Sequence, residues 1–223
     1  MDFIGNRSSG ATDYGYRGLA TAARGYRNNS WSGTLGAVLT PPTSLAAVSP
    51  YGGPATNVLL GANYDPLFAV SNVAALTPGV LLLVKLQVPD GGVLSNIWFA
   101  TGGAATAPTS GQNFVGVYAA PAGGALLGTS ADQTAGNFAS GGAKVAALTV
   151  ATAAQPAGTA VYVAFLFNGT TAPTIRGITG SPAAVNILAS PARFATAGTG
   201  LTSLPSTLPT LIASLIPIWA GVA

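Results

Sequence analysis

Short apolar runs separated by turn residues follow one another along this chain from about Phe68 onward. In residues 82–88 every second side chain is apolar, whereas the set between them consists of Leu83, Lys85 and Gln87. Successive side chains of a strand point to opposite faces, so this period of two predicts a strand with one face toward water.

Residues 161–167 form the most regular run, because both of their alternating sets of side chains are apolar. A strand that is apolar on both faces lies centrally in a sheet and is covered on each side. We expect the opposite sheet to cover one face, and a loop, another subunit or the N-terminal part of the chain to cover the other. The turn signal Asn168-Gly169 ends this strand.

The turn residues 89–92 follow the first of these strands, and a second alternating run, 93–100, comes directly after them. Two runs joined by so short a turn predict a β-hairpin. The alternation of the second run places Val93, Ile97 and Phe99 on one face and Leu94, Asn96 and Trp98 on the other.

The remaining short runs bring the number of expected strands to about eight, at a spacing typical of sandwiches and jelly rolls. These further strands are expected over residues 114–119, 126–127, 144–150, 185–188 and 192–195. The sequence therefore predicts an all-β protein, with a jelly-roll-like β-sandwich over residues 67–200.

Residues 1–66 show no sustained period and contain several prolines, which predicts a long irregular N-terminal arm. Ordering such a segment costs about 1–2 kcal/mol per residue, which only extensive contacts can offset. We therefore expect an arm that anchors the protein to a partner. The side chains expected to make this assembly contact are cationic or aromatic: Arg7, Tyr14, Tyr16, Arg17, Arg24, Tyr26, Arg27 and Trp31.

The composition of the arm leaves three interpretations to compare: docking onto a protein, binding of nucleic acid, and a solvated arm. Arginine and tyrosine are common in protein interfaces, but cations with interleaved aromatics can also bind nucleic acid. Four arginines and two aspartates give residues 1–31 a charge of only +2. We therefore expect docking onto a protein scaffold, with nucleic acid and a solvated arm as the less favoured interpretations.

Residues 201–223 are rich in leucine and isoleucine and form an apolar C-terminal tail. The tail is expected to pack on the sandwich or on a neighbouring subunit, and the second is favoured because large apolar patches usually mark interfaces. Its apolar run is broken by Pro209 and Pro217 and is shorter than the roughly 20 residues of a membrane-spanning helix. We expect no membrane insertion.

The composition strengthens the expectation of an assembly. Of the 223 residues, 49% are hydrophobic and 6% are charged, and the net charge is +3. An ordinary soluble domain has about a quarter charged residues. So uncharged a surface favours self-association or burial on a larger particle. The first residues also lack the basic and apolar regions of a secretory signal, so export by the general pathway is not expected.

The residue inventory argues against an enzyme. The chain has no histidine, no cysteine and no glutamate. The sequence therefore lacks the residue types of the usual catalytic triads, thiolate nucleophiles and zinc sites. Asp90 and Asp132 are expected to be solvated turn residues rather than a catalytic pair. We expect no catalytic residues, no metal and no cofactor. For saccharide recognition the candidates are Trp98 and Tyr118, but core packing is the favoured interpretation of each.

Five segments carry a resemblance to a known family: residues 93–99, 113–118, 130–134, 160–169 and 192–195. In this order they resemble the β-sandwich modules of minor tail and fibre proteins from bacteriophages of actinobacteria. The resemblance covers residues 68–205 and implies a virion protein that is trimeric and exposed on the tail or head. It also implies adhesion to the host envelope, with a host cell-surface glycan as a partner.

We therefore expect a structural protein of the virion, a minor tail protein or tail-associated adhesion subunit whose arm anchors it and whose sandwich faces outward. The alternative is a capsid decoration protein, a head fibre or cement protein whose arm runs over the shell. A free carbohydrate-binding module is a third interpretation, but it explains neither the arm nor the apolar surface.

Overall fold

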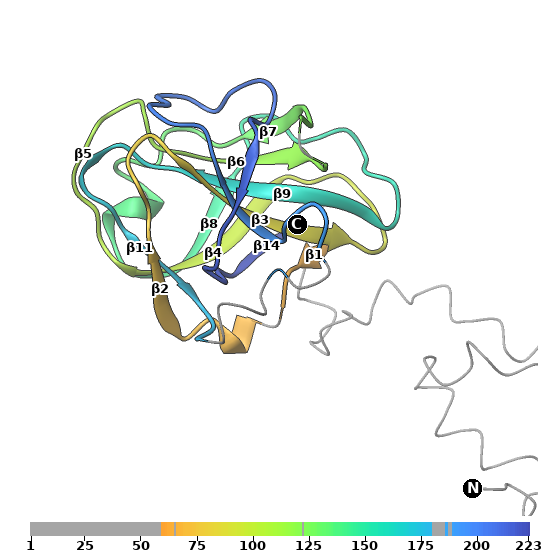
Figure 1. The fold of residues 1–223 in the computed structure, drawn as a ribbon, viewed down its shortest axis with the longest axis horizontal. Helices are drawn as coiled ribbons and strands as arrows, with labels where there is room; N and C mark the ends of the chain where they lie inside the picture. Colours follow the sequence, from red (N-terminus) through yellow and green to blue (C-terminus); the bar gives the residue numbers. More distant parts are fainter. Residues whose placement is uncertain (1–58, 65, 122, 180–185, 187–188) are drawn as a thin grey trace, which may run out of the picture. The chain divides into compact units, whose positions relative to one another are not determined.

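The computed structural model describes residues 59–64, 66–121, 123–179, 186 and 189–223. The described part of the chain is all-β, as the sequence predicts, and its strands pair in antiparallel sheets (Figure 1). Its only helices are two short 3₁₀ helices, η6 (Pro66–Phe68) and η7 (Asn137–Ala139). Most of the predicted arm lies outside the described residues.

Six strands form sheet B in the order β13, β12, β3, β9, β6 and β7. Their bounds are Leu211–Ala213 (β13), Phe194–Ala197 (β12), Leu81–Val88 (β3), Thr159–Leu166 (β9), Phe114–Ala119 (β6) and Leu126–Thr129 (β7). Strand β9 lies between β3 and β6, which is the central position expected of a strand that is apolar on both faces.

Sheet A also has six strands, and β4 is its centre. The bounds are Gly61–Ala62 (β1), Ala220–Val222 (β14), Asn96–Gly103 (β4), Gly142–Ala147 (β8), Thr174–Gly177 (β11) and Ser71–Ala75 (β2). Trp98 of β4 is in register with both Gly221 of β14 and Val145 of β8, so these two strands lie on opposite edges of β4. Strand β11 also pairs with β4 opposite β8, and β14 and β11 therefore follow one another along one edge. A small separate sheet pairs β5 (Thr106–Pro108) with β10 (Gly169–Thr171).

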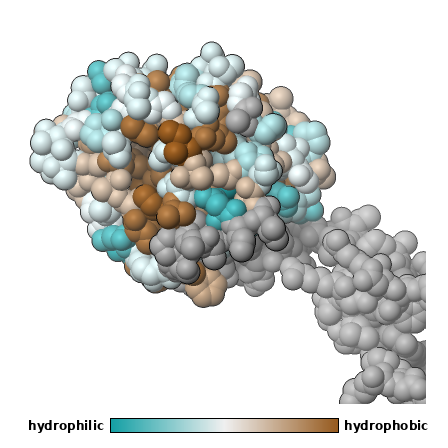
Figure 2. Space-filling view, in the orientation of Figure 1, coloured by the Kyte–Doolittle hydropathy of each residue, from teal (hydrophilic) through white to brown (hydrophobic). Residues whose placement is uncertain are grey.

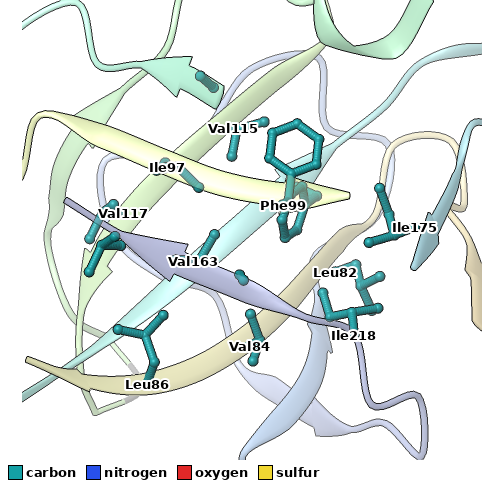
Figure 3. Close-up of a cluster of buried hydrophobic side chains, with 14 of the residues drawn as sticks. Leu82, Val84, Leu86, Ile97, Phe99, Val115, Val117, Val163, Ile175 and Ile218 are labelled. Atoms are coloured by element: carbon teal, nitrogen blue, oxygen red, sulfur yellow. The ribbon is translucent and has the colours of Figure 1, made fainter. Parts of the chain in front are cut away.

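The inner faces of the two sheets share one hydrophobic core. Figure 3 shows Ile97 and Phe99 of β4 on one side of it and Val84 of β3 and Val163 of β9 on the other. The rings of Phe99 and Phe165 meet edge to face with their centroids 5.1 Å apart. Burying one such aliphatic or aromatic side chain contributes about 1.5–3 kcal/mol, so this layer is the main source of the fold's stability.

Strand β3 departs from its predicted wet face. Its inner side chains are buried as expected, but Leu81 and Leu83 on the other face are fully buried as well. Only toward the end of the strand does that face reach water, at the half-buried Lys85 and the exposed Gln87. The wet-face prediction is therefore wrong for the first half of the strand, because a second apolar layer covers it.

The predicted hairpin over residues 82–100 is also wrong. Strand β3 belongs to sheet B and the next strand, β4, belongs to sheet A, so residues 89–95 carry the chain from one sheet to the other. The place beside β3 is taken by β9. Because β4 begins only at Asn96, the residues before it do not follow its alternation: Val93 is 49% exposed and Leu94 is buried.

The C-terminal segment packs on its own chain rather than on a neighbouring subunit, which was the position that the sequence favoured. Strand β14 lies inside sheet A between β1 and β4, and β13 forms one edge of sheet B. Leu201, Leu204 and Leu208 lie in the layer that covers the outer face of sheet B. The sheets thus extend beyond residues 67–200 at both ends.

The other predicted strands correspond to observed ones with small shifts at their ends. Residues 114–119 are β6, and β7, β8 and β12 fall on the other predicted runs. Of the strand predicted over 185–188, only Asn186 is described, and it lies in a turn.

Candidate assembly surfaces

The residues predicted to anchor the arm cannot be placed, because all of them lie outside the described part of the chain. They are Arg7, Tyr14, Tyr16, Arg17, Arg24, Tyr26, Arg27 and Trp31. The candidate surfaces discussed below therefore belong to the two sheets and the loops between them.

Trp98 lies on the outer face of sheet A and is 38% exposed. Its neighbour in β8, Val145, is 43% exposed, and its neighbour in β14 is Gly221, which has no side chain. A Cβ atom at Gly221 would lie 3.1 Å from the Leu59 side chain. Leu59, Trp98 and Val145 therefore form an apolar strip across this face, where the indole remains accessible to a ligand or partner.

Tyr118 is not a surface residue, and its assignment to surface recognition is wrong. It lies in β6 with no exposed area, beneath the C-terminal layer on sheet B. Its hydroxyl donates a hydrogen bond of 2.8 Å to the carbonyl oxygen of Pro205, and burial raises the pKa of Tyr118 above its usual value. The sequence could not reveal this, because the covering segment is far away along the chain.

Asp132 is not a freely solvated turn residue. Its carboxylate accepts hydrogen bonds from the backbone N–H groups of Gly111 and Asn113, at 2.9 and 3.1 Å, and from the Thr134 hydroxyl at 2.9 Å. Burial alone would raise the pKa of Asp132, but the hydrogen bonds from Gly111, Thr134 and Asn113 together hold it below its usual value. The carboxylate thus joins two loops, and its oxygens are occupied by structural bonds.

Asn113 extends this polar cluster and is fully buried. Its amide nitrogen donates to the Thr109 carbonyl at 2.6 Å and to the Thr134 hydroxyl at 2.7 Å, and its oxygen accepts the Asn168 N–H at 2.8 Å. Buried polar groups are normally satisfied in this way. From the sequence, Asp132 and Asn168 had been interpreted only as turn residues, and Asn113, which precedes the run 114–119, had been given no role of its own.

Charge contributes little to the exterior of the described part. The charged residues there are Lys85, Asp90, Asp132, Lys144, Arg176 and Arg193, and no salt bridge joins any of them. The Lys85 ammonium group donates to the Pro191 carbonyl at 2.7 Å, and burial together with the charge of Arg193 lowers the pKa of Lys85.

Large apolar side chains reach the surface at several places, and Figure 2 shows hydrophobic residues gathered on the face that is turned to the viewer. The exposed ones in the described part of the chain are Phe68, Val70, Val93, Trp98, Val145, Val150, Ile178, Ile212 and Leu215. Single exposed apolar residues are ordinary in proteins, so what matters is where they cluster.

One side of the paired sheets is closed by bonds within the chain. The edge strand β7 is joined to the segment after β8, where the Thr149 N–H donates to the Thr129 carbonyl at 2.8 Å. Leu126 of β7 also donates to the Ser206 carbonyl at 2.8 Å. On the edge of β8, the Asn137 amide donates to the Val145 carbonyl at 2.7 Å. Both edge strands on this side therefore have partners beyond their own ladders.

The other side, which we call the open side, is bounded by the edge strands β13 and β2. Within the described residues, β13 pairs only with β12 and β2 pairs only with β11. Near β13 are Ile212, 66% exposed, and Leu215, 53% exposed, and before β2 are Phe68, 55% exposed, and Val70, 70% exposed. Open strand edges with apolar side chains are places where further strands add in protein assembly.

The described residues contain no group of three acidic side chains that could hold a metal ion. No helix found among them has the length and apolarity needed to cross a membrane. In comparisons with known proteins, no family model matches the chain, and no curated protein matches it either. The exposed surfaces of the two sheets are therefore the features that bear on function.

Proposed function

We propose that this chain is a structural protein of a bacteriophage virion, a minor tail protein or tail-associated adhesion subunit. The observation that carries the proposal is the surface of the folded part, where large apolar side chains are exposed and few charges accompany them. Such a surface is stable in water mainly when part of it is covered by other subunits. The resemblance of residues 68–205 to phage tail and fibre modules supports a bacteriophage virion as the particle to which the chain belongs.

We also propose that the two sheets form a jelly-roll-like β-sandwich. Two observations support this architecture: facing side chains of the two sheets fill one core, and the chain crosses from one sheet to the other at residues 89–95. In the virion the sandwich faces outward, and the arm of residues 1–66, which holds four of the chain's eight Lys and Arg residues, anchors it to other virion proteins.

The subunits form a homo-oligomer, and the resemblance implies three copies. Adhesion to a host cell-surface glycan would use the apolar strip with Trp98, since exposed aromatic rings can stack on sugar rings. Trp98 is the only one of the two predicted aromatic candidates that is exposed, which makes a free carbohydrate-binding module a weaker proposal than a virion subunit. We propose no catalytic activity and no bound cofactor.

A capsid decoration protein is the second candidate. It is favoured by the length of the segment before the first described strand, since a long arm could run over a shell and bind neighbouring subunits. The number of copies in each particle distinguishes the two candidates. A tail protein would be present in a few to tens of copies, and a decoration protein in hundreds.

Removal of the arm tests the anchoring role. Particles assembled with a chain that lacks residues 1–57 should lose this protein on gradient purification, while the truncated chain should keep the unfolding transition of the intact body. As a matched control, Trp98→Ala in the full chain should leave attachment to the particle unchanged. Normal attachment of the truncated chain would contradict the anchoring role.

A further inference from the structure

Within the described part of the chain, strand β13 presents unpaired backbone groups along the open side of sheet B. The Ser214 N–H donates to the Phe194 carbonyl at 2.9 Å, and hydrogen-bonded pairs alternate with non-bonded pairs along an antiparallel ladder. Ile212 and Thr196 are therefore the next bonded pair. It follows that the N–H and C=O groups of Leu211 and Ala213 point away from β12, toward the open side.

The side chains around this edge are apolar. Ile212 is in register with Thr196 and Leu82, which places it on the face of sheet B that carries the core. It nevertheless remains 66% exposed, because it lies at the rim of the sheet. Leu215, two residues after β13, is 53% exposed. A strand added here would therefore bury apolar side chains while it satisfies the free backbone groups.

Among the described residues, β13 has none of the usual protection of an edge strand. Natural proteins block such edges with charged side chains, prolines or bulges, or cover them with another segment. The edges of β7 and β8 are covered by the chain itself, through the bonds of Leu126 and Val145. Residues 211–216 contain neither a charge nor a proline, and residues 201–223 contain no charge at all.

We propose that a second copy of this chain docks on the open side, with a strand of that copy pairing with the outer edge of β13. An uncharged edge matches an identical copy, because no like charges on the two edge strands repel one another. A charged partner would find no opposite charge on β13 to bind. The charged residues nearest to β13 along the pairing order are Arg193, just before β12, and Lys85 of β3.

This inference deepens the proposed function, because it assigns the surface through which copies associate. It can also fail by itself. If the protein is anchored in a virion as separate single copies, the proposed function holds and the pairing through β13 is wrong. The reverse is true if the protein self-associates through β13 but never enters a particle.

Two variants with a matched control test the inference on the full chain. Ile212→Lys places a charge on the exposed edge, and Ala213→Pro removes an outward N–H group that β12 does not use. Val150→Lys adds the same charge at a residue that is 74% exposed, in the segment that follows β8 on the closed side. The readouts are the molar mass in solution, by light scattering, and the thermal unfolding transition, which shows that each variant is folded.

The wild-type chain and Val150→Lys should have the mass of a multimer. For Ile212→Lys and Ala213→Pro, the dissociation constant of the multimer should be at least tenfold higher than for the wild type. The amide hydrogens of residues 211 and 213 should exchange slowly only in the multimer. A monomeric wild-type chain would overturn the inference. So would folded Ile212→Lys and Ala213→Pro variants that keep the multimer, or a multimer in which these amides exchange freely.

Discussion

The hydroxyl of Tyr118 and the carbonyl oxygen of Pro205, 87 positions apart in the chain, are joined by a hydrogen bond of 2.8 Å. This bond lies at the centre of the layer in which the C-terminal segment covers the outer face of sheet B. This layer explains why the outer side chains of β6 and β9 can be apolar, since the chain itself covers them. The exposed surface that remains for assembly is therefore at the sheet edges and on sheet A.

Tyr118→Phe removes the hydroxyl and leaves the Pro205 carbonyl without this donor. The ring itself still fills its buried site, so the expected loss is that of one buried hydrogen bond, about 1–2 kcal/mol in the free energy of unfolding. Urea denaturation measures it. If the variant unfolds at the same urea concentration as the wild type, the C-terminal segment is not held by this bond.

Gly116→Ala should destabilise the protein because a Cβ atom there would collide with the Leu204 side chain and lie 3.0 Å from the Gly128 carbonyl oxygen. Overpacking of this kind typically costs about 1–3 kcal/mol. The double variant with Leu204→Ala should lose less than the sum of the two single variants, since the second substitution makes room for the first.

Gly103→Ala is the matched control for this experiment. A Cβ at Gly103 would meet only the Thr174 hydroxyl oxygen, at 3.6 Å, which is ordinary contact. Its unfolding free energy should stay within about 0.5 kcal/mol of the wild type, as for a substitution that meets no obstacle. Strictly additive effects of Gly116→Ala and Leu204→Ala would show that the C-terminal layer does not pack against β6.

The stability of the protein should fall as the pH rises above about 10, the ordinary pKa of tyrosine. Burial raises the pKa of Tyr162 to about 12, and its hydroxyl donates to the Ala192 carbonyl at 2.6 Å. Between these two values the unfolded chain loses this proton while the folded chain keeps it, so deprotonation favours unfolding. Tyr162→Phe should flatten part of this alkaline dependence in unfolding measurements from pH 9 to 12. An unchanged profile would mean that Tyr162 is accessible to hydroxide in the folded state.

The hydrogen bonds of Asp132 predict how the stability of the protein changes in acid. Its hydrogen bonds lower the pKa of the folded state relative to the usual value, so its contribution to stability is complete above about pH 4. The contribution is lost as the pH falls through the lower pKa of the folded state. Asp132→Asn should cost about 1 kcal/mol near neutral pH, at the low end for a charged hydrogen bond because the carboxylate is partly exposed. It should also lose less further stability between pH 5 and 2 than the wild type does. Parallel pH profiles for the two proteins would contradict this role.

The strands could be predicted where local alternation decides the structure. Residues 161–167 are apolar in both alternating sets, and β9 is buried on both faces in the middle of its sheet. The all-β class follows from the same patterns and from the lack of glutamate, which helices normally use on their wet face. These features depend on neighbouring residues alone, which is why one sequence is sufficient to find them.

The pairing of the strands could not be predicted in the same way. A turn of four residues at 89–92 fits a hairpin locally, but residues 89–95 carry the chain to the other sheet, and β9 occupies the place beside β3. The burial of Tyr118 depends on a segment near Pro205, and the polar cluster depends on Asn113, Asp132 and Asn168 meeting from three loops. Contacts between residues so far apart leave no local pattern in the sequence.

The sequence predicted that the protein has an assembly surface, but not where on the fold it lies. Low charge and high apolar content indicated that part of the exterior is covered in an assembly, but not which part. Core packing was the favoured interpretation of Trp98 from the sequence, but the residue is partly exposed on the outer face of sheet A. The open edge of β13 could not be found from the sequence, because no strand was predicted over residues 211–213 and the position of β13 at the edge depends on the pairing order of the whole sheet.

The most direct test of the account is whether the chain is part of a phage particle. Particles should be purified on density gradients from the source that encodes this chain, and their proteins should be identified by mass spectrometry beside those of the soluble fraction. Peptides from this chain should be found in the particle fraction at a constant ratio to the other particle proteins. Their presence in the soluble fraction alone would contradict the proposed function.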